Sequence, residues 1–182
     1  PPSDKWVIGY IGNMYPAPNW QTVCRSLVEL LTHHPELKTK LELKFAGNID
    51  GRVMETFTEY GLDSYINYIG YLSHESAVKE MLSSHVLLLV INAIEGNEHV
   101  LTGKIFEYMG TGKPILFSGP VPGDAYHLLT ESGKVWLPEM LSQKDFQIEE
   151  MTHSTYRYES FTRKHLTQKL SSLLNRLIEK GN

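Results

Sequence analysis

The residues best suited to chemistry lie between Asn92 and Ser118, in a polar loop that separates two apolar runs. Thr102, Gly103 and Lys104 stand where a helix is expected to begin, and Glu107 follows about one turn later on the same face. The free N–H groups and positive dipole end of a helix start favour phosphate, and a lysine adds positive charge. A glutamate one turn on can accept two hydrogen bonds from the vicinal hydroxyls of a ribose. The spacing therefore predicts a site for a nucleoside diphosphate.

The elements that must position these residues alternate between apolar runs and amphipathic segments along the whole chain. Such alternation predicts a single α/β domain over residues 1–182, with a Rossmann-like, open and mostly parallel sheet of about six strands and helices on both faces. Ligands bind such sheets at the carboxyl ends of the strands. Strands are expected at 5–11, 41–46, 66–69, 86–91, 114–117 and 134–137. Helices are expected at 19–33, 50–60, from 73, from about 102, at 125–129 and at 161–178.

Several helix positions carry more local expectations. Asn19 and Asp124 are expected to cap the helices that follow them. Met81 and Leu82 are expected on the inner face of the helix that begins at Ser73. In the last helix, leucines repeat at intervals of three and four, which predicts a face packed in the core: Leu166, Leu170, Leu173, Leu174 and Leu177.

Gly12 follows the first strand, where a glycine turn approaches the ligand in doubly wound sheets. A simple strand-to-helix turn explains this glycine equally well. Cys24 falls beside the apolar face of the next helix and is interpreted as a small buried thiol, because no neighbouring charge would stabilise its thiolate.

The segment T-G-K-I-F-E-Y-M-G-T-G-K-P-I-L, residues 102–116, resembles the signature of the C-terminal, nucleotide-sugar-binding half of GT-B glycosyltransferases of the GT4-like group. The resemblance implies that Glu107 binds the ribose and that Thr102, Gly103 and Lys104 bind the diphosphate, with Lys104 and Glu107 as the catalytic positions. It also implies that the strand end at Gly47 lies over the nucleotide.

A second segment, I-N-Y-I-G-Y-L-S-H-E-S at residues 66–76, resembles the family's base-contacting strand end. The resemblance implies that Tyr71 and Leu72 meet the nucleotide base, although packing at a strand end explains them as well.

The sequence departs from the family pattern at two places. The loop after the first strand usually carries an arginine and a lysine, and this chain has Asn13 and Pro16 there. Asn13 then stays a candidate contact, and the phosphate charge shifts onto Lys104. The family's first glutamate is replaced by His99, with Glu98 one position earlier. Either Glu98 or His99 is a candidate for contacting the donor sugar, and a solvated histidine is the plainer interpretation of His99.

The activity that the resemblance implies is transfer of a sugar from a nucleotide-diphosphate sugar, such as a UDP or GDP sugar, with retention and without a metal or other cofactor. It implies an N-terminal GT-B domain as partner in the full-length chain, so this fragment alone is expected to be inactive. Bacterial polysaccharide biosynthesis, a cytoplasmic location and peripheral membrane association of the full enzyme are further implications.

Composition excludes several other classes. A net charge of −4 argues against nucleic-acid binding. No apolar run approaches the roughly 20 residues of a membrane span, and no charged-then-apolar segment marks the N-terminus as a targeting signal. A single cysteine fits a reducing cytoplasm. Gly103-Lys104 is followed by Ile105, where a P-loop needs serine or threonine for magnesium. No histidine or cysteine spacing predicts a zinc site.

Two alternatives remain. A nucleotide-sugar epimerase of GT-B fold would share the donor site and differ in its product. A non-catalytic α/β binding module, such as a receiver-like domain, would need acidic residues at the end of the first strand, where Asn13 and Met14 stand instead.

Overall fold

A computed structural model describes residues 4–152, 156–157 and 159–180. Its sheet has six strands in the order β3-β2-β1-β4-β5-β6, and every pair of neighbours is parallel. The predicted Rossmann-like class is confirmed. The strand order reverses between β1 and β4, which makes their carboxyl ends the place where such sheets bind ligands. The strands are Trp6–Ile11 (β1), Leu41–Ala46 (β2), Ile66–Gly70 (β3), Val86–Val90 (β4), Ile115–Ser118 (β5) and Val135–Trp136 (β6).

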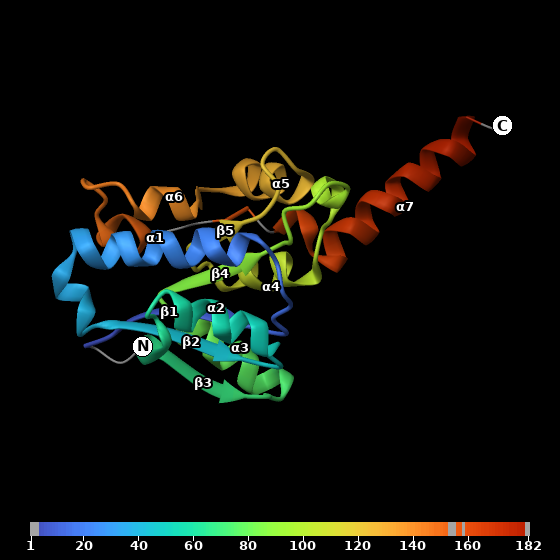
Figure 1. The fold of residues 1–182 in the computed structure, drawn as a ribbon. Coiled ribbons are helices and arrows are strands. Elements are labelled where there is room, and N and C mark those ends of the chain that lie inside the picture. The colour runs from blue at the N-terminus through green and yellow to red at the C-terminus, as the bar shows by residue number, and fades with distance from the viewer. Residues whose placement is uncertain (1–3, 153–155, 158, 181–182) are drawn as a thin grey trace.

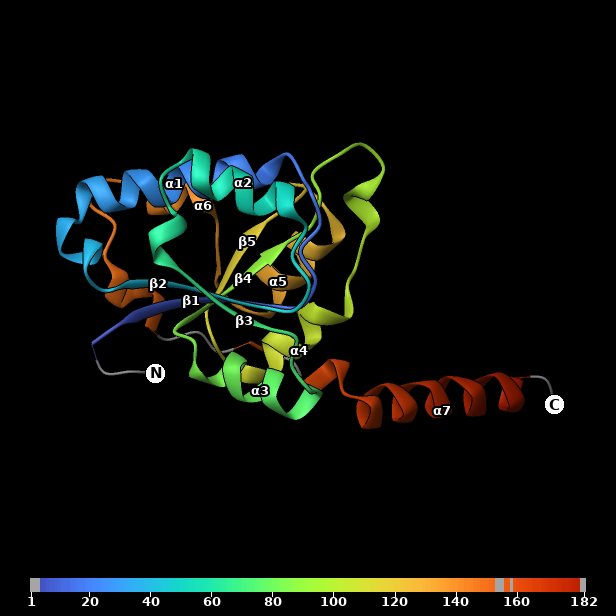
Figure 2. The same cartoon turned by 60° about the horizontal axis from the view of Figure 1, so that its bottom comes forward.

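Helices cover both faces of this sheet, as Figures 1 and 2 show. One face carries α1 (Asn19–His33), α2 (Gly51–Glu59) and α6 (Pro138–Leu141); the other carries α3 (His74–Ser83), α4 (Gly103–Thr111) and α5 (Asp124–Ser132). A last helix, α7, spans Arg163–Lys180. Short 3₁₀ turns complete the chain: Pro35–Lys38 (η1), Asp63–Tyr65 (η2), Asn97–His99 (η3), Ile148–Thr152 (η4) and Glu159–Phe161 (η5).

The core consists of two apolar clusters, one on each face of the sheet. Side chains of α1 and α2 pack on the first cluster, and side chains of α3, α4 and α5 pack on the second. Every residue of β1 is buried, as expected for a strand covered on both faces, where hydrophobic runs replace alternation. Cys24 lies in the first cluster and is fully buried, and burial raises the pKa of its thiol to about 12. The thiol is therefore a packing group, as predicted.

Three local predictions were wrong. Pro18, and not Asn19, occupies the cap of α1, because the Asn19 side chain turns inward to Ile91 and Ser118. Asp124 is the first residue of α5 instead of its cap. On α3, Met81 is buried as expected, but Leu82 is 48% exposed, because the inner face of this helix is narrower than the pattern suggested.

The apolar face of α7 was also predicted incorrectly. This helix extends away from the body of the domain (Figure 2). Four of its leucines are therefore 44–57% exposed instead of packed in a core: Leu166, Leu170, Leu173 and Leu174. The side chain of Leu177, the fifth leucine of the predicted face, lies outside the part of the chain that the structure describes. Periodicity identified an apolar face, but it could not show whether anything in this chain covers that face.

Candidate functional site

Glycine lets three strand ends approach one another closely at the carboxyl edge of the sheet. Gly12, Gly47 and Gly70 follow or end β1, β2 and β3 with φ of +137°, +108° and +76°. The Gly47 N–H donates to the Gly70 carbonyl at 2.8 Å. A Cβ added at Gly47 would overlap the backbone of Gly12. A larger residue at either position would push the strand ends apart, since this backbone region strains other residue types.

A pocket of about 260 Å³ opens at these strand ends, on the side of the sheet covered by α3 and α4. We call it the glycine-lined pocket. Six residues singled out from the sequence line it together: Gly12, Asn13, Gly47, Tyr71, Leu72 and Glu107. The rest of its wall was not foreseen and comes from Ile11, Ala46, His74, Ala77 and Met81.

Lys104 lies beside this pocket, against the loop that follows β1. A Cβ at Gly12 would come within 2.6 Å of its Nζ, and the Nζ lies 3.8 Å from the centroid of the Tyr10 ring. Burial lowers the pKa of Lys104 to about 8, and the nearby Glu107 carboxylate opposes that shift. The ring of Tyr10 and the glycine turn thus hold the ammonium group at the edge of the pocket.

Tyr10 was not singled out from the sequence. Its only sequence signal is its place near the end of the first strand, and the strand pattern does not reveal that Lys104 packs over it.

The start of α4 is held against β1 by a buried hydrogen bond. The Ile11 N–H donates to the Tyr108 hydroxyl at 3.0 Å, across 97 residues of sequence. The helix begins where it was expected: Thr102 occupies the N-cap position, and α4 starts at Gly103. The Thr102 side chain makes no capping bond, and its Oγ1 is buried without a hydrogen-bond partner among the described residues. The first N–H groups of α4 lack intrahelical partners, so this end can hold an anion next to Lys104.

Glu98 and His99 lie outside the glycine-lined pocket. The Glu98 carboxylate accepts a hydrogen bond from the Gly96 N–H at 2.8 Å and faces a different pocket. The His99 ring is 84% exposed, and its Nδ1 lies 3.2 Å from an oxygen of Asp124. The structure therefore separates these two residues from Lys104 and Glu107, because η3 carries the loop away from the start of α4.

Within the described ranges, no group of three or more His, Cys, Asp and Glu side chains could hold a metal ion. No helix there is long and apolar enough to cross a membrane.

No family model and no curated protein matches this chain. Solved structures do. A structure titled Anabaena Alr3699/HepE in complex with UDP and glucose matches with a TM-score of 0.64 and 13% identity, over 96% of this chain and 49% of that one. A mutant of S. aureus TarM in complex with Fondaparinux, alpha-GlcNAc-glycerol and UDP matches with a TM-score of 0.57 and 12% identity, over 97% and 35%.

A third match is an alpha,alpha-trehalose-phosphate synthase from Burkholderia vietnamiensis, with a TM-score of 0.55 and 13% identity over 82% of this chain and 38% of that chain. The chain thus has the fold of one half of GT-B glycosyltransferases. It spans about half, or less, of the length of these neighbours. At such low identity, the similarity establishes the fold, and function must be argued from the site.

Proposed function

We propose that this chain is the donor-binding half of a glycosyltransferase, and that the glycine-lined pocket holds a nucleotide-diphosphate sugar. The observation that carries the proposal is the meeting of Gly12, Gly47, Glu107 and Lys104 at one edge of the sheet, although they come from three distant segments. The site combines an anion-binding helix start, a fixed cation and a carboxylate within one turn of helix.

The parts of a nucleotide fit these groups in order. Glu107 is exposed in the pocket wall and would accept hydrogen bonds from the two ribose hydroxyls. The base would lie near Tyr71, whose side chain is 81% exposed, and Leu72. The diphosphate would lie over Gly12 and the first N–H groups of α4, with Lys104 beside it.

In the proposed reaction, the bond between the anomeric carbon and the diphosphate oxygen breaks, the anomeric carbon bonds to an acceptor oxygen, and the proton of that acceptor passes to the departing diphosphate. Negative charge then grows on the diphosphate. Lys104 and the N–H groups at the start of α4 would stabilise that charge, because fixed dipoles and cations need no reorganisation as the bond breaks. Glu107 would set the position of the donor by holding its ribose.

The finer assignment follows the sequence resemblance. We propose a retaining, GT4-like enzyme whose N-terminal domain binds the acceptor, so that this half alone binds the donor without appreciable turnover. The half-length match to the structural neighbours supports a missing domain. UDP is the first donor nucleotide to test, since the HepE and TarM structures contain it. A cytoplasmic enzyme of bacterial polysaccharide synthesis, associated peripherally with the membrane when complete, remains part of this proposal.

Calorimetric titration with UDP, GDP and ADP tests the donor site. We expect one of the three to bind, and Lys104→Ala and Glu107→Ala each to weaken it by about tenfold or more, or roughly 1.4 kcal/mol. Lys38→Ala and Glu29→Ala are matched controls, because both residues are exposed and lie away from the pocket. The proposal fails if none of the three diphosphates binds at about 1 mM, a dissociation constant that corresponds to a binding free energy of roughly −4 kcal/mol.

A separate experiment distinguishes a transferase from an epimerase. The full-length protein, incubated with the sugar nucleotide that binds, should release the nucleoside diphosphate and glycosylate an acceptor. An altered sugar that stays attached to the nucleotide would identify an epimerase instead.

A further inference from the structure

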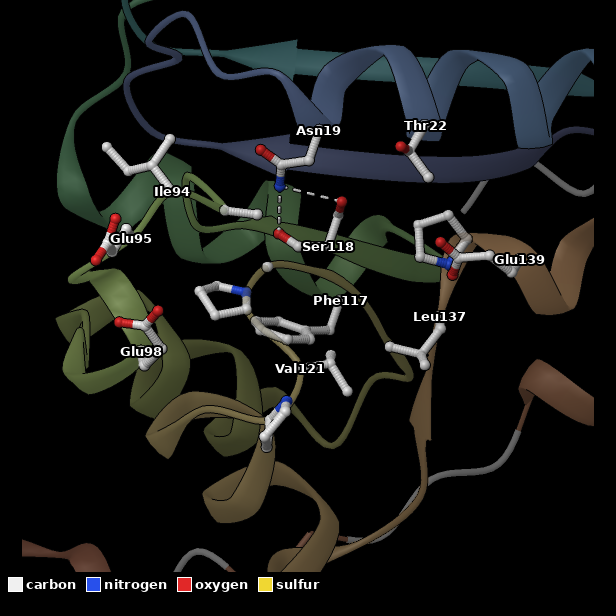
Figure 3. Close-up of a pocket in the computed structure, with 15 residues that line it drawn as sticks. Asn19, Thr22, Ile94, Glu95, Glu98, Phe117, Ser118, Val121, Leu137 and Glu139 are labelled. Carbon is white, nitrogen blue, oxygen red and sulfur yellow. Dashed lines mark hydrogen bonds between the residues drawn. The ribbon is translucent and has the colours of Figure 1, made fainter.

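A larger pocket, of about 920 Å³, lies at the same edge of the sheet and shares no lining residue with the glycine-lined pocket. It lies over the ends of β4 and β5, between the start of α1, the loop before α4, the loop after β5 and the turn before α6 (Figure 3). We call it the acidic pocket. Its volume falls in the range of small-molecule sites, which are usually clefts of about 300–1,000 Å³.

The charged side chains in the wall of the acidic pocket all have the same sign. Glu95, Glu98 and Glu139 line it, and no lysine, arginine or histidine does. Glu95 and Glu139 are exposed and make no ion pair within the described part of the chain. A phosphate or other anion placed here would meet like charges without a compensating cation, so its binding is disfavoured.

The wall of the acidic pocket also holds a buried polar group that the chain does not fully satisfy. Asn19 is only 8% exposed, and its Nδ2 donates to the carbonyls of Ile91 at 3.0 Å and Ser118 at 2.8 Å. These bonds fix the orientation of the amide, and Figure 3 shows the contact with Ser118. The Asn19 Oδ1 is left as a buried acceptor without a partner in the described residues. An unpaired buried acceptor is unfavourable, and a hydroxyl that donates a hydrogen bond to it would offset that cost.

Apolar surface completes the acidic pocket. Phe117, Val121 and Leu137 contribute side chains to the wall, and Thr22 adds a hydroxyl from α1. Figure 3 shows these groups around one hollow, with the carboxylates at its margins. Acceptor oxygens beside apolar surface suit a molecule that has many hydroxyl donors and apolar C–H faces.

We propose that the acidic pocket is a saccharide site that accepts an uncharged sugar or an amino sugar and excludes phosphorylated ones. The carboxylates would accept hydrogen bonds from ring hydroxyls and attract an ammonium group, and the apolar wall would contact the C–H face of the ring. The acidic pocket shares no lining residue with the glycine-lined pocket, so its occupancy can be tested separately from nucleotide binding.

Titration of the ¹⁵N-labelled chain with glucose, glucosamine and glucose 6-phosphate, followed by NMR, tests this proposal. We expect millimolar binding of glucose, tighter binding of glucosamine, and binding of glucose 6-phosphate at least about tenfold weaker than that of glucose. Thr22→Tyr should fill part of the pocket and weaken glucose at least about fivefold, whereas Thr32→Tyr, on an exposed turn of the same helix, should not. Glu139→Lys should weaken glucosamine most, with the exposed Glu131→Lys as its control.

The outcomes separate this inference from the proposed function. Absence of saccharide binding, or saccharide binding that Thr22→Tyr leaves unchanged in a folded variant, overturns the inference whether or not UDP binds. Tighter binding of glucose 6-phosphate than of glucose overturns it as well. Saccharide binding that survives Glu107→Ala, while UDP binding is lost, supports two separate sites.

Discussion

The two pockets at the carboxyl edge of the sheet share no lining residue, and they differ in the chemistry of their walls. The glycine-lined pocket is lined by two glycine turns, at Gly12 and Gly47, and by one carboxylate, that of Glu107, with one lysine beside it. The acidic pocket has three carboxylates, a buried amide and apolar side chains, and no basic residue. Under the two proposals, one sheet edge offers both an anion site and an anion-excluding site, because the loops that line each pocket carry different charges.

The largest expected effect comes from Gly12→Val. A Cβ at this position would come within 2.6 Å of Lys104 Nζ, and the backbone has φ of +137°, which β-branched residues do not adopt without strain. We expect UDP affinity measured by calorimetry to fall about 100-fold, or roughly 2.7 kcal/mol, with glucose binding unchanged. Gly110→Ala is the control, since its Cβ would meet no other atom. UDP affinity within about threefold of the original would contradict a nucleotide at Gly12.

A change of pH is expected to have a smaller effect, and to alter the binding of UDP in the glycine-lined pocket only. The Lys104 pKa of about 8 means that the ammonium form, which attracts the diphosphate, is lost as pH rises through that value. The phosphates of UDP are already ionised above pH 7, since their second pKa is about 6. UDP affinity should therefore fall roughly tenfold between pH 7 and pH 9.

Variants of Lys104 provide the control for that pH profile. Lys104→Arg should flatten the profile and keep the affinity, because a guanidinium group stays charged at pH 9. Lys104→Ala should also remove the pH dependence, but with weaker UDP binding at every pH. An unchanged pH dependence in Lys104→Arg would assign the titration to another group.

The smallest expected effect is that of Tyr108→Phe. This substitution removes the hydroxyl that accepts the Ile11 N–H at 3.0 Å, and it leaves a buried donor unpaired. The free energy of unfolding, measured with urea, should fall by about 1–3 kcal/mol. UDP binding should weaken by no more than about threefold, and glucose binding should not change. Tyr126→Phe is the control, because this hydroxyl makes no hydrogen bond within the described part of the chain. Equal stability of the two variants would show that the Ile11–Tyr108 bond does not hold α4 to β1.

Much of the glycine-lined pocket could be predicted from sequence because its signals are local. Apolar runs indicate strands that are covered on both faces, and a glycine after such a strand indicates the carboxyl edge of the sheet. Helical spacing then places Lys104 and Glu107 on the same face of one helix. The resemblance to the glycosyltransferase family then added Tyr71 and Leu72 as predicted contacts of the nucleotide base. The parallel topology brings those strand ends together without further information.

The acidic pocket could not be predicted in this way. Asn19 is a good helix cap by type, but its hydrogen-bond partners lie 72 and 99 residues away, at Ile91 directly after β4 and at Ser118 at the end of β5. Glu95 and Glu139 read as ordinary solvated carboxylates until the fold places them around one hollow. The contact of Lys104 with Tyr10 and the exposed leucines of α7 were missed for the same reason. Sequence periodicity shows which side chains share a face of a helix, but only the tertiary structure shows what that face contacts.

The most direct test of the donor-site proposal is an NMR titration of the ¹⁵N-labelled chain with UDP, read at the glycine amides. If UDP binds in the glycine-lined pocket, the signals of Gly12, Gly47 and Gly103 should move together with one dissociation constant, while those of Gly61 and Gly110 stay in place. Movement confined to Gly119 and Gly123, at the acidic pocket and the loop after β5, would contradict it, as would the absence of any shift.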